Sequence, residues 1–113
     1  MNYEHIVRFN DIKVDLMELR VWHGEKDIHF TLSELRLLLV FLLEPYKVIS
    51  RDELIKRVDL TNAGALYSLI SRLRALLGQE YVFSRDGMGY SFARTGRLRI
   101  PIEGGEEHER TSA

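Results

Sequence analysis

The stretch LISRLRALLG at residues 69–78 decides the fold prediction, because it continues an apolar stripe that begins at Leu66. Leucine and isoleucine recur at i, i+3, i+4, i+7, i+10 and i+11, which is the spacing of one buried helix face. The residues on the opposite face are small: Gly64, Ser68, Ser71 and Ala75. We predict a helix over about 62–77, with Thr61 or Asn62 as its N-cap and Gly78 at its C-terminal end.

Two further helices precede this one. Thr31 with Glu34, and Ser50 with Glu53, have the spacing of a capping box, in which a hydroxyl and a carboxylate satisfy backbone N–H groups at a helix start. The first helix should run to about residue 43, before Pro45, and its all-apolar segment 37–43 predicts cover on more than one face. SRDELIKRVD at residues 50–59 predicts a short second helix.

Strands are expected on either side of the helices. HIVRF, IKVDL and LRVW in the first thirty residues alternate apolar and polar positions, which is typical of three or four short antiparallel strands. EYVFS and YSFAR flank the turn RDGMG and predict a hairpin over about 81–92, where Gly87 and Gly89 supply positive φ. The predicted class is α+β, with an N-terminal antiparallel sheet, three helices and a C-terminal hairpin.

Composition limits the kinds of function. The chain has no cysteine, which excludes disulfides and thiolate metal sites. No secretory signal is visible, and the longest apolar run is far below the roughly 20 residues of a membrane span, so we expect a cytoplasmic protein. His23 and His29 are interpreted as surface histidines. No catalytic motif is present, so we predict no enzymatic activity, no cofactor and no metal.

Charge is unevenly distributed along the chain. The formal net charge is −1, although nucleic-acid-binding domains are usually basic. Between Leu60 and Arg99, however, six arginines face only Glu80 and Asp86. A locally basic surface on a nearly neutral chain is therefore expected. Beyond residue 93 the sequence is first basic and then acidic and glycine-rich, and we expect this tail, residues 94–113, to be flexible.

The order of these elements resembles the winged-helix effector domain of the OmpR/PhoB response-regulator family. FTLSELRLLLVFLL resembles the family's first helix and VISRDELIKRV its second. ISRLRALLG is similar to its recognition helix and GMGYSF to its wing. The resemblance implies one winged helix-turn-helix domain over residues 1–93. Because the matches cover only the effector part of such regulators, we expect a stand-alone, divergent member.

The resemblance implies a transcriptional regulator that binds double-stranded DNA with sequence preference. The helix at about 62–77 would enter the major groove, and the wing at about 81–92 would lie at the minor groove. Arg72 and Arg74 match family arginines that touch DNA, and we assign Arg72 to a base and Arg74 to a phosphate. The candidate DNA-binding residues are Asn62, Tyr67, Ser68, Ser71, Arg72, Arg74, Arg85, Gly87, Arg94 and Arg97.

Several of these assignments have an alternative. Arg72 and Arg74 are also typical of a solvated helix surface, and Tyr67 either touches DNA or packs on a neighbouring helix. Arg94 and Arg97 form either a phosphate-binding arm or a solvated linker. The alternative function is a winged-helix protein–protein interaction module with little or no DNA affinity, since a smooth helix face bordered by arginines also suits a protein partner.

Two departures from the family pattern affect the expected partners. Asp86 stands where the wing usually carries arginine, and the neighbouring Arg85 belongs to the other face of the strand. The connection between the second and third helices is several residues shorter than usual. The family implies RNA polymerase, another regulatory protein or a second copy on tandem half-sites as further partners, but this loop is the polymerase contact. Its shortness argues against conventional activation.

Overall fold

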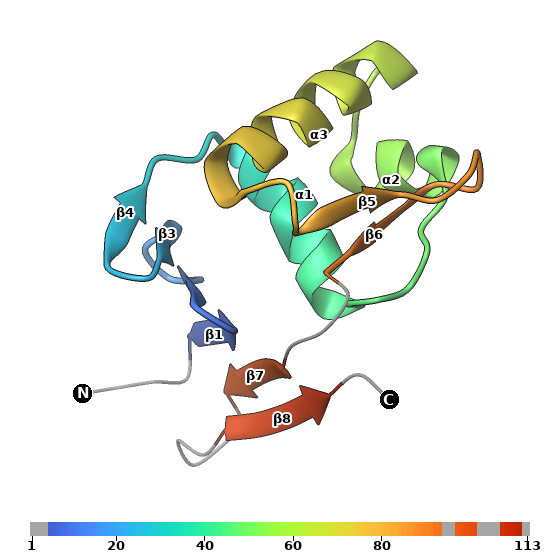
Figure 1. Ribbon diagram of the computed structural model, residues 1–113. Helices are drawn as coiled ribbons and strands as arrows, with labels where there is room; N and C mark the ends of the chain where they lie inside the picture. Colours follow the sequence, from blue (N-terminus) through green and yellow to red (C-terminus); the bar gives the residue numbers. More distant parts are fainter. Residues whose placement is uncertain (1–4, 94–96, 102–106, 112–113) are drawn as a thin grey trace. The chain divides into compact units, whose positions relative to one another are not determined.

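The computed structural model describes residues 5–93, 97–101 and 107–111 (Figure 1). It divides into two compact units. The sheet unit comprises Met1–Phe30 with Thr95–Ala113, and the helical unit comprises Thr31–Arg94. The predicted class and arrangement are confirmed, since an N-terminal antiparallel sheet is followed by three helices and a hairpin.

The N-terminal sheet is a meander of four short strands. They are β1 (Ile6–Phe9), β2 (Ile12–Asp15), β3 (Arg20–His23) and β4 (Lys26–Ile28), each antiparallel to the next. One face holds the buried apolar side chains Val7, Phe9, Ile12, Val14, Val21 and Ile28. The other face carries polar and aromatic side chains, with Lys13 Nζ and Arg20 Cζ lying 4.4 Å and 4.9 Å from the Trp22 ring centroid. This alternation is the period-two pattern seen in the sequence.

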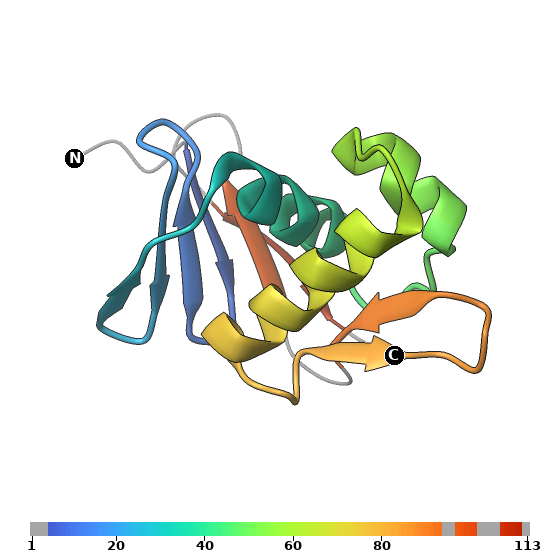
Figure 2. The ribbon, with the colours of Figure 1, turned by 90° about the horizontal axis from the view of Figure 1, so that it is seen from above.

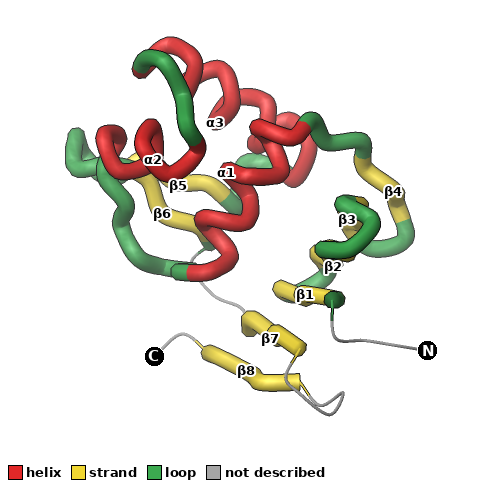
Figure 3. The backbone as a smooth tube through the Cα atoms, turned by 180° about the vertical axis from the view of Figure 1, so that it is seen from behind, coloured by secondary structure: helices red, strands yellow, loops and turns green. Residues whose placement is uncertain are grey.

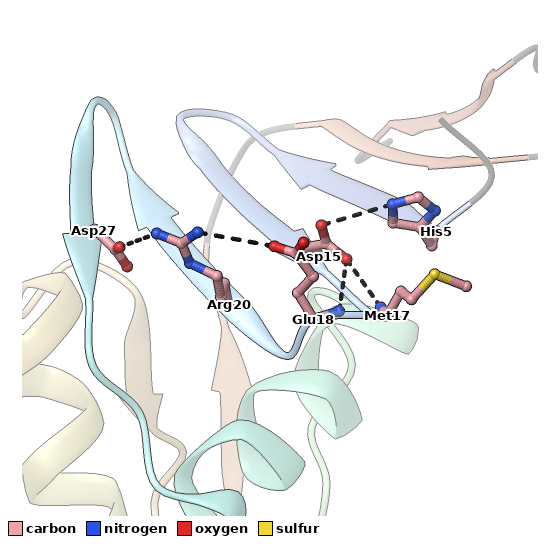
Figure 4. Close-up of polar contacts among 6 residues, drawn as sticks. All are labelled: His5, Asp15, Met17, Glu18, Arg20 and Asp27. Atoms are coloured by element: carbon pink, nitrogen blue, oxygen red, sulfur yellow. Dashed lines mark hydrogen bonds and ion pairs between the residues drawn. The ribbon is translucent and has the colours of Figure 1, made fainter. Parts of the chain in front are cut away.

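Polar contacts hold the turn between β2 and β3 (Figure 4). Asp15 Oδ1 accepts the backbone N–H groups of Met17 and Glu18, each at 2.9 Å. The other oxygen of Asp15 lies 3.6 Å from His5 Nε2. Arg20 pairs with Asp27 on β4, which joins the strands on either side of the next turn. Asp15 therefore works as a turn residue as well as the last residue of a strand.

The tail, which the sequence predicts to be flexible, contributes two strands to the sheet in its described segments. β7 (Arg97–Pro101) pairs with β1, and β8 (Glu107–Thr111) pairs with β7, so the sheet has the order β4-β3-β2-β1-β7-β8. Leu98 lies opposite Phe9 and is buried. The physical reason is that RLRIP alternates polar and apolar residues, and the free edge of β1 offers unpaired N–H and C=O groups to such a strand. The prediction of a flexible tail considered only charge and glycine content and did not take this alternation into account.

The helical unit contains three helices (Figures 1 and 3). They are α1 (Leu32–Leu43), α2 (Arg51–Val58) and α3 (Ala63–Leu77). The capping box of α1 is complete, with Thr31 Oγ1 accepting from Glu34 N and Glu34 Oε1 accepting from Thr31 N. Ser50 caps α2, and of the two residues proposed for α3, Asn62 is the cap. The predicted helices are confirmed.

The core of the helical unit joins all three helices to the hairpin. Leu54 from α2, Leu66 and Ile70 from α3, and Phe41 from α1 are almost fully buried. Phe92 is fully buried and stacks on Phe41 and Tyr81, at ring-centroid distances of 5.8 Å and 5.6 Å. Residues on several sides of α1 are buried, as the all-apolar segment predicted.

The hairpin consists of β5 (Val82–Ser84) and β6 (Tyr90–Phe92), and its turn lies toward α2 (Figures 1 and 3). Asp86 and Gly87 have φ of 41° and 73°, which is the conformation of a turn that suits right-twisted strands. Tyr90 exchanges backbone hydrogen bonds of 2.8 Å and 2.9 Å with Ile49. A Cβ on Gly89 would lie 2.0 Å from Ile49 O, so this close approach requires glycine.

Candidate nucleic-acid interface

One side of α3 is free of cover, and we call it the outer face. The buried side of the helix is apolar, with Leu66, Ile70, Leu73 and Leu77 at most 2% exposed. The outer face consists of the exposed residues Gly64, Tyr67, Ser68, Ser71, Arg72 and Ala75. Five of them, all except Gly64, line a shallow depression of about 580 Å³. The predicted orientation of the helix is therefore confirmed, with α1 packed along one side of α3 (Figure 2). The small side chains of the outer face allow close approach to a partner.

Arg72 is held by a buried carboxylate. Its Nε donates to Glu34 Oε2 at 3.1 Å, and the Glu34 side chain is only 6% exposed. The Arg72 side chain itself is 58% exposed. The contact through Nε leaves the two terminal nitrogens on the exposed part of the guanidinium, where they can donate to an incoming acceptor.

Arg74, the predicted phosphate ligand, fastens α3 to the hairpin. Its Nε donates to Val82 O at 3.1 Å and its Nη2 donates to Ser84 Oγ at 3.2 Å. Both acceptors lie on β5, so this side chain fixes the hairpin against the end of α3. The contacts explain why Arg74 is less exposed than Arg72.

A second depression, of about 240 Å³, lies between α2, α3 and the hairpin. Its lining residues are Arg51, Tyr67, Ser84, Gly87, Gly89 and Tyr90. Arg51 Nη1 donates to Tyr67 Oη at 2.6 Å, and this hydrogen bond raises the pKa of Arg51 above its ordinary value. Tyr67 thus contacts α2 through its hydroxyl group. Its side chain is nevertheless 43% exposed and lines both depressions.

Sequence reasoning missed Arg51. The signal was available, because Arg51 directly follows the N-cap Ser50 and so occupies the first turn of α2. In the sequence it is one residue of the segment SRDELIKRVD, which predicts the second helix. Its place beside α3 depends on how α2 and α3 cross, which the local sequence does not give.

The turn of the hairpin is less basic than its sequence neighbours indicate. Arg85 Nε donates to Ser91 Oγ at 2.8 Å, and Ser91 is fully buried. Asp86 and Gly87 are exposed at the turn, and Met88 is 69% exposed. The structure thus holds Arg85 against the hairpin and presents a carboxylate and a thioether at its end.

Asn62 lines neither of these depressions. Asn62 Oδ1 accepts Ala65 N at 2.8 Å, so this oxygen is occupied by its capping role. Arg94 lies outside the described residues. The backbone of Arg97 is part of β7, but its side chain is not described. The structure therefore brings together Tyr67, Ser68, Ser71 and Arg72, with Gly87 across the second depression from Tyr67.

The cations around the outer face are bound mainly to neutral oxygens. Arg51 donates to a phenol, Arg74 to a carbonyl and a hydroxyl, and Arg85 to a hydroxyl. These acceptors carry no formal charge, so the hydrogen bonds order the side chains without neutralising them. Arg72, in contrast, is paired with a carboxylate. The region retains the positive charge that attracts phosphates.

Within residues 5–93, 97–101 and 107–111, no helix is long and apolar enough to cross a bilayer. The same segments contain no group of three or more histidine, aspartate or glutamate residues placed to hold a metal ion.

Similar proteins identify the family. Residues 24–92 match the family described as "Transcriptional regulatory protein, C terminal". The transcriptional regulatory protein CseB of Streptomyces coelicolor is 34% identical over 89 residues, which are 75% of this chain and 38% of CseB. The chain spans about two fifths of the length of the curated relatives it matches.

Solved structures give the same result. The response regulator DrrB, an OmpR/PhoB homologue from Thermotoga maritima, matches with a TM-score of 0.71 and 25% identity, covering 79% of this chain and 44% of DrrB. The DNA-binding domain of RstA from Klebsiella pneumoniae, solved in complex with the RstA box, matches in fold with a TM-score of 0.70 and 22% identity, covering 78% and 96% of the two chains. The chain belongs to the transcriptional regulatory protein C-terminal family, the winged-helix effector domains of OmpR/PhoB type.

Proposed function

We propose that this chain binds double-stranded DNA with sequence preference and acts as a transcriptional regulator. The exposed outer face of α3 is the observation that carries the proposal, because its small residues leave the helix surface smooth and cations surround it. An α-helix fits a major groove about 12 Å wide, and small side chains let it lie deep there. The domain of RstA, which has the same fold, is solved with its DNA box.

Base readout in this proposal comes from the first depression. Ser68 and Ser71 offer hydroxyls to base edges, Tyr67 offers an apolar edge to a thymine methyl group, and the terminal nitrogens of Arg72 suit the O6 and N7 atoms of guanine. The oxygen of Asn62 caps α3 and its Nδ2 donates one hydrogen to Thr61 Oγ1 at 3.4 Å, so the second amide hydrogen is the group it can offer to a base. The preference is therefore centred on Arg72.

Phosphate contacts come from the region around the second depression. Arg51 and Arg74 lie where α2 and β5 meet α3, and Gly87 leaves the turn of the hairpin without a side chain. Phosphate contacts fix the register of a protein on the duplex without reading sequence. From their positions in the sequence shortly after the hairpin, Arg94 and Arg97 are proposed as further phosphate ligands.

The hairpin takes a smaller part at the minor groove. Arg85 is held on Ser91, and Asp86 repels phosphates. Gly87 permits close approach, so the expected contribution is steric rather than electrostatic.

The short connection between α2 and α3 bears on partners. α2 ends at Val58 and α3 begins at Ala63, with Asp59 in the left-handed conformation at the C-cap of α2. This connection leaves little surface for docking RNA polymerase. We therefore expect regulation to depend on where the domain binds, alone or as two copies on tandem half-sites.

Binding to duplex DNA tests the proposal. The purified chain should bind a random duplex in a fluorescence anisotropy titration, and log affinity should fall with log salt at a slope of about −3 to −5 if four or so phosphates are neutralised. Selection from a random duplex library should then recover a preferred site. Binding with no salt dependence, or no binding at low salt, would instead favour a protein-docking module.

A further inference from the structure

One buried carboxylate links α1 to the outer face of α3. Glu34 Oε1 accepts the backbone N–H of Thr31 at 2.8 Å, and Oε2 accepts Arg72 Nε at 3.1 Å. Both oxygens are therefore engaged, and their partners lie on two different elements. The Glu34 side chain is 94% buried, and burying a carboxylate costs free energy unless it is hydrogen-bonded. Glu34 therefore needs both contacts.

The contact restrains an exposed arginine at one atom. A free arginine side chain loses much rotamer freedom when it binds a base, and this loss weakens binding. The Glu34 carboxylate fixes Nε, so much of that freedom is lost in the free protein. The two terminal nitrogens, Nη1 and Nη2, remain available. Together they can donate to the two acceptors on the major-groove edge of guanine, O6 and N7.

The same contact makes Arg72 a weak attractor of phosphates. The carboxylate of Glu34 offsets the charge of the guanidinium next to it, whereas Arg51 and Arg74 donate to neutral oxygens. Non-specific affinity depends on charge, and base readout depends on direction. The pair is therefore suited to discrimination between sequences.

We propose that Glu34 is a positioning residue that determines DNA specificity by aiming the guanidinium of Arg72 at a guanine in the major groove. This inference rests on the proposed function, because it requires the outer face of α3 to enter that groove. It assigns to a residue of α1 a role beyond capping its own helix.

The substitution Glu34→Gln separates the two roles of the residue. Glutamine also serves in a capping box, so its oxygen can keep the bond to Thr31 N. Its amide nitrogen would then face Arg72 Nε, and two donors cannot bond. The matched control is Glu53→Gln, which removes the same charge at the same position relative to the N-cap of α2, where the carboxylate is exposed.

The experiment compares affinities for the duplex recovered by library selection and for a scrambled duplex of equal length. Glu34→Gln should lower the ratio of the two affinities about tenfold, which is about 1.4 kcal/mol. Affinity for the scrambled duplex should change by less than about threefold, as it should in Glu53→Gln. In an Arg72→Ala background, Glu34→Gln should leave the ratio unchanged, and circular dichroism verifies folding.

A measurement without DNA tests the restraint itself. In the free wild-type chain, the Nε–H group of Arg72 should give a resolved ¹⁵N–¹H cross-peak with slow solvent exchange, assigned by its loss in Arg72→Ala. Exposed Arg36 on α1 provides the fast-exchanging reference. Equal exchange for both arginines overturns the inference, even if Glu34→Gln does not fold.

The outcomes separate the two proposals. If the wild-type chain binds no duplex, the proposed function fails and this inference fails with it. If Arg72→Ala lowers the affinity ratio but Glu34→Gln leaves it unchanged, only the role of Glu34 fails. A loss of both affinities in proportion, with a lower melting temperature, would show that Glu34 is merely structural.

Discussion

The outer face of α3 and the turn of the hairpin each carry an arginine, Arg72 and Arg85, but the two side chains have different contacts and exposure. Arg72 is fixed at Nε by Glu34 and keeps 58% of its side chain exposed. Arg85 donates its Nε to the buried Ser91, and the turn beyond it presents Asp86 and Met88. A held arginine that still faces outward can read bases, whereas one folded against the hairpin mainly stabilises it.

The attachment of the hairpin supports this division. Arg74 joins β5 to α3, and the backbone pair between Ile49 and Tyr90 joins β6 to the segment before α2. The hairpin is thus tied to α3 and to the segment that leads into α2. In the proposed interface the hairpin would therefore serve mainly to hold α3 in place.

The largest effect should come from detaching the hairpin with Gly89→Ala. The new Cβ would lie 2.0 Å from Ile49 O, which no backbone at this position can accept without moving. We expect the free energy of unfolding to fall by more than about 3 kcal/mol, because the strain adds to loss of the Ile49–Tyr90 pair. Urea unfolding followed by circular dichroism measures this change.

Gly87→Ala is the matched control in the same turn. Its Cβ would meet nothing within 4 Å, and its φ of 73° costs only the usual left-handed penalty, about 1 kcal/mol. Equal destabilisation by the two alanines would contradict the idea that Gly89 matters through its contact with Ile49.

Arg72→Ala should have the next largest effect, on DNA binding. Loss of a bidentate base contact costs about 1–3 kcal/mol and relaxes sequence preference at one position. The measurement is a gel-shift titration on the selected duplex, with a repeated library selection to detect the relaxed position. Unchanged affinity and unchanged preference would remove Arg72 from the interface.

Arg51→Ala should weaken binding without changing preference. Arg51 lies beside Tyr67 in the second depression, and a phosphate contact there contributes equally for every sequence. We expect roughly three- to tenfold lower affinity for both selected and scrambled duplexes, and a salt slope smaller by about 1. Tyr67→Phe is the control, since it removes the hydrogen bond but keeps the charge. A selective loss on the selected duplex would indicate base readout instead.

Much of the fold could be predicted from local sequence, because each signal was short-range. The capping pairs at Thr31 and Ser50 fixed two helix starts, and the apolar stripe of α3 fixed its buried side. The glycines of RDGMG located the turn of the hairpin. The strands in the tail were missed, because the pairing of β7 with β1 joins residues about ninety positions apart, and charge content says nothing about such pairing.

The site was less predictable than the fold. Helical periodicity placed Ser68, Ser71 and Arg72 on one face, but it could not show what each side chain contacts. The partners of Arg72 and Arg74 come from α1 and β5, so they depend on how the elements cross. Arg51 and Glu34 were assigned to helix starts in the sequence and gained their place beside α3 only through packing.

The smallest effect, with the opposite sign, is expected at the turn of the hairpin. Asp86→Asn removes one negative charge, and asparagine tolerates the φ of 41° at this position, so the turn should keep its shape. If Asp86 lies near the minor groove, affinity should rise about two- to threefold at low salt and return to the wild-type value at high salt, where the charge is screened. Anisotropy titrations at two ionic strengths measure this, with thermal melting to verify the fold. An unchanged affinity at low salt would place the turn away from the phosphates. The proposed contact surface would then consist of α3 and the start of α2 alone, and the difference between the outer face of α3 and the turn of the hairpin would be larger.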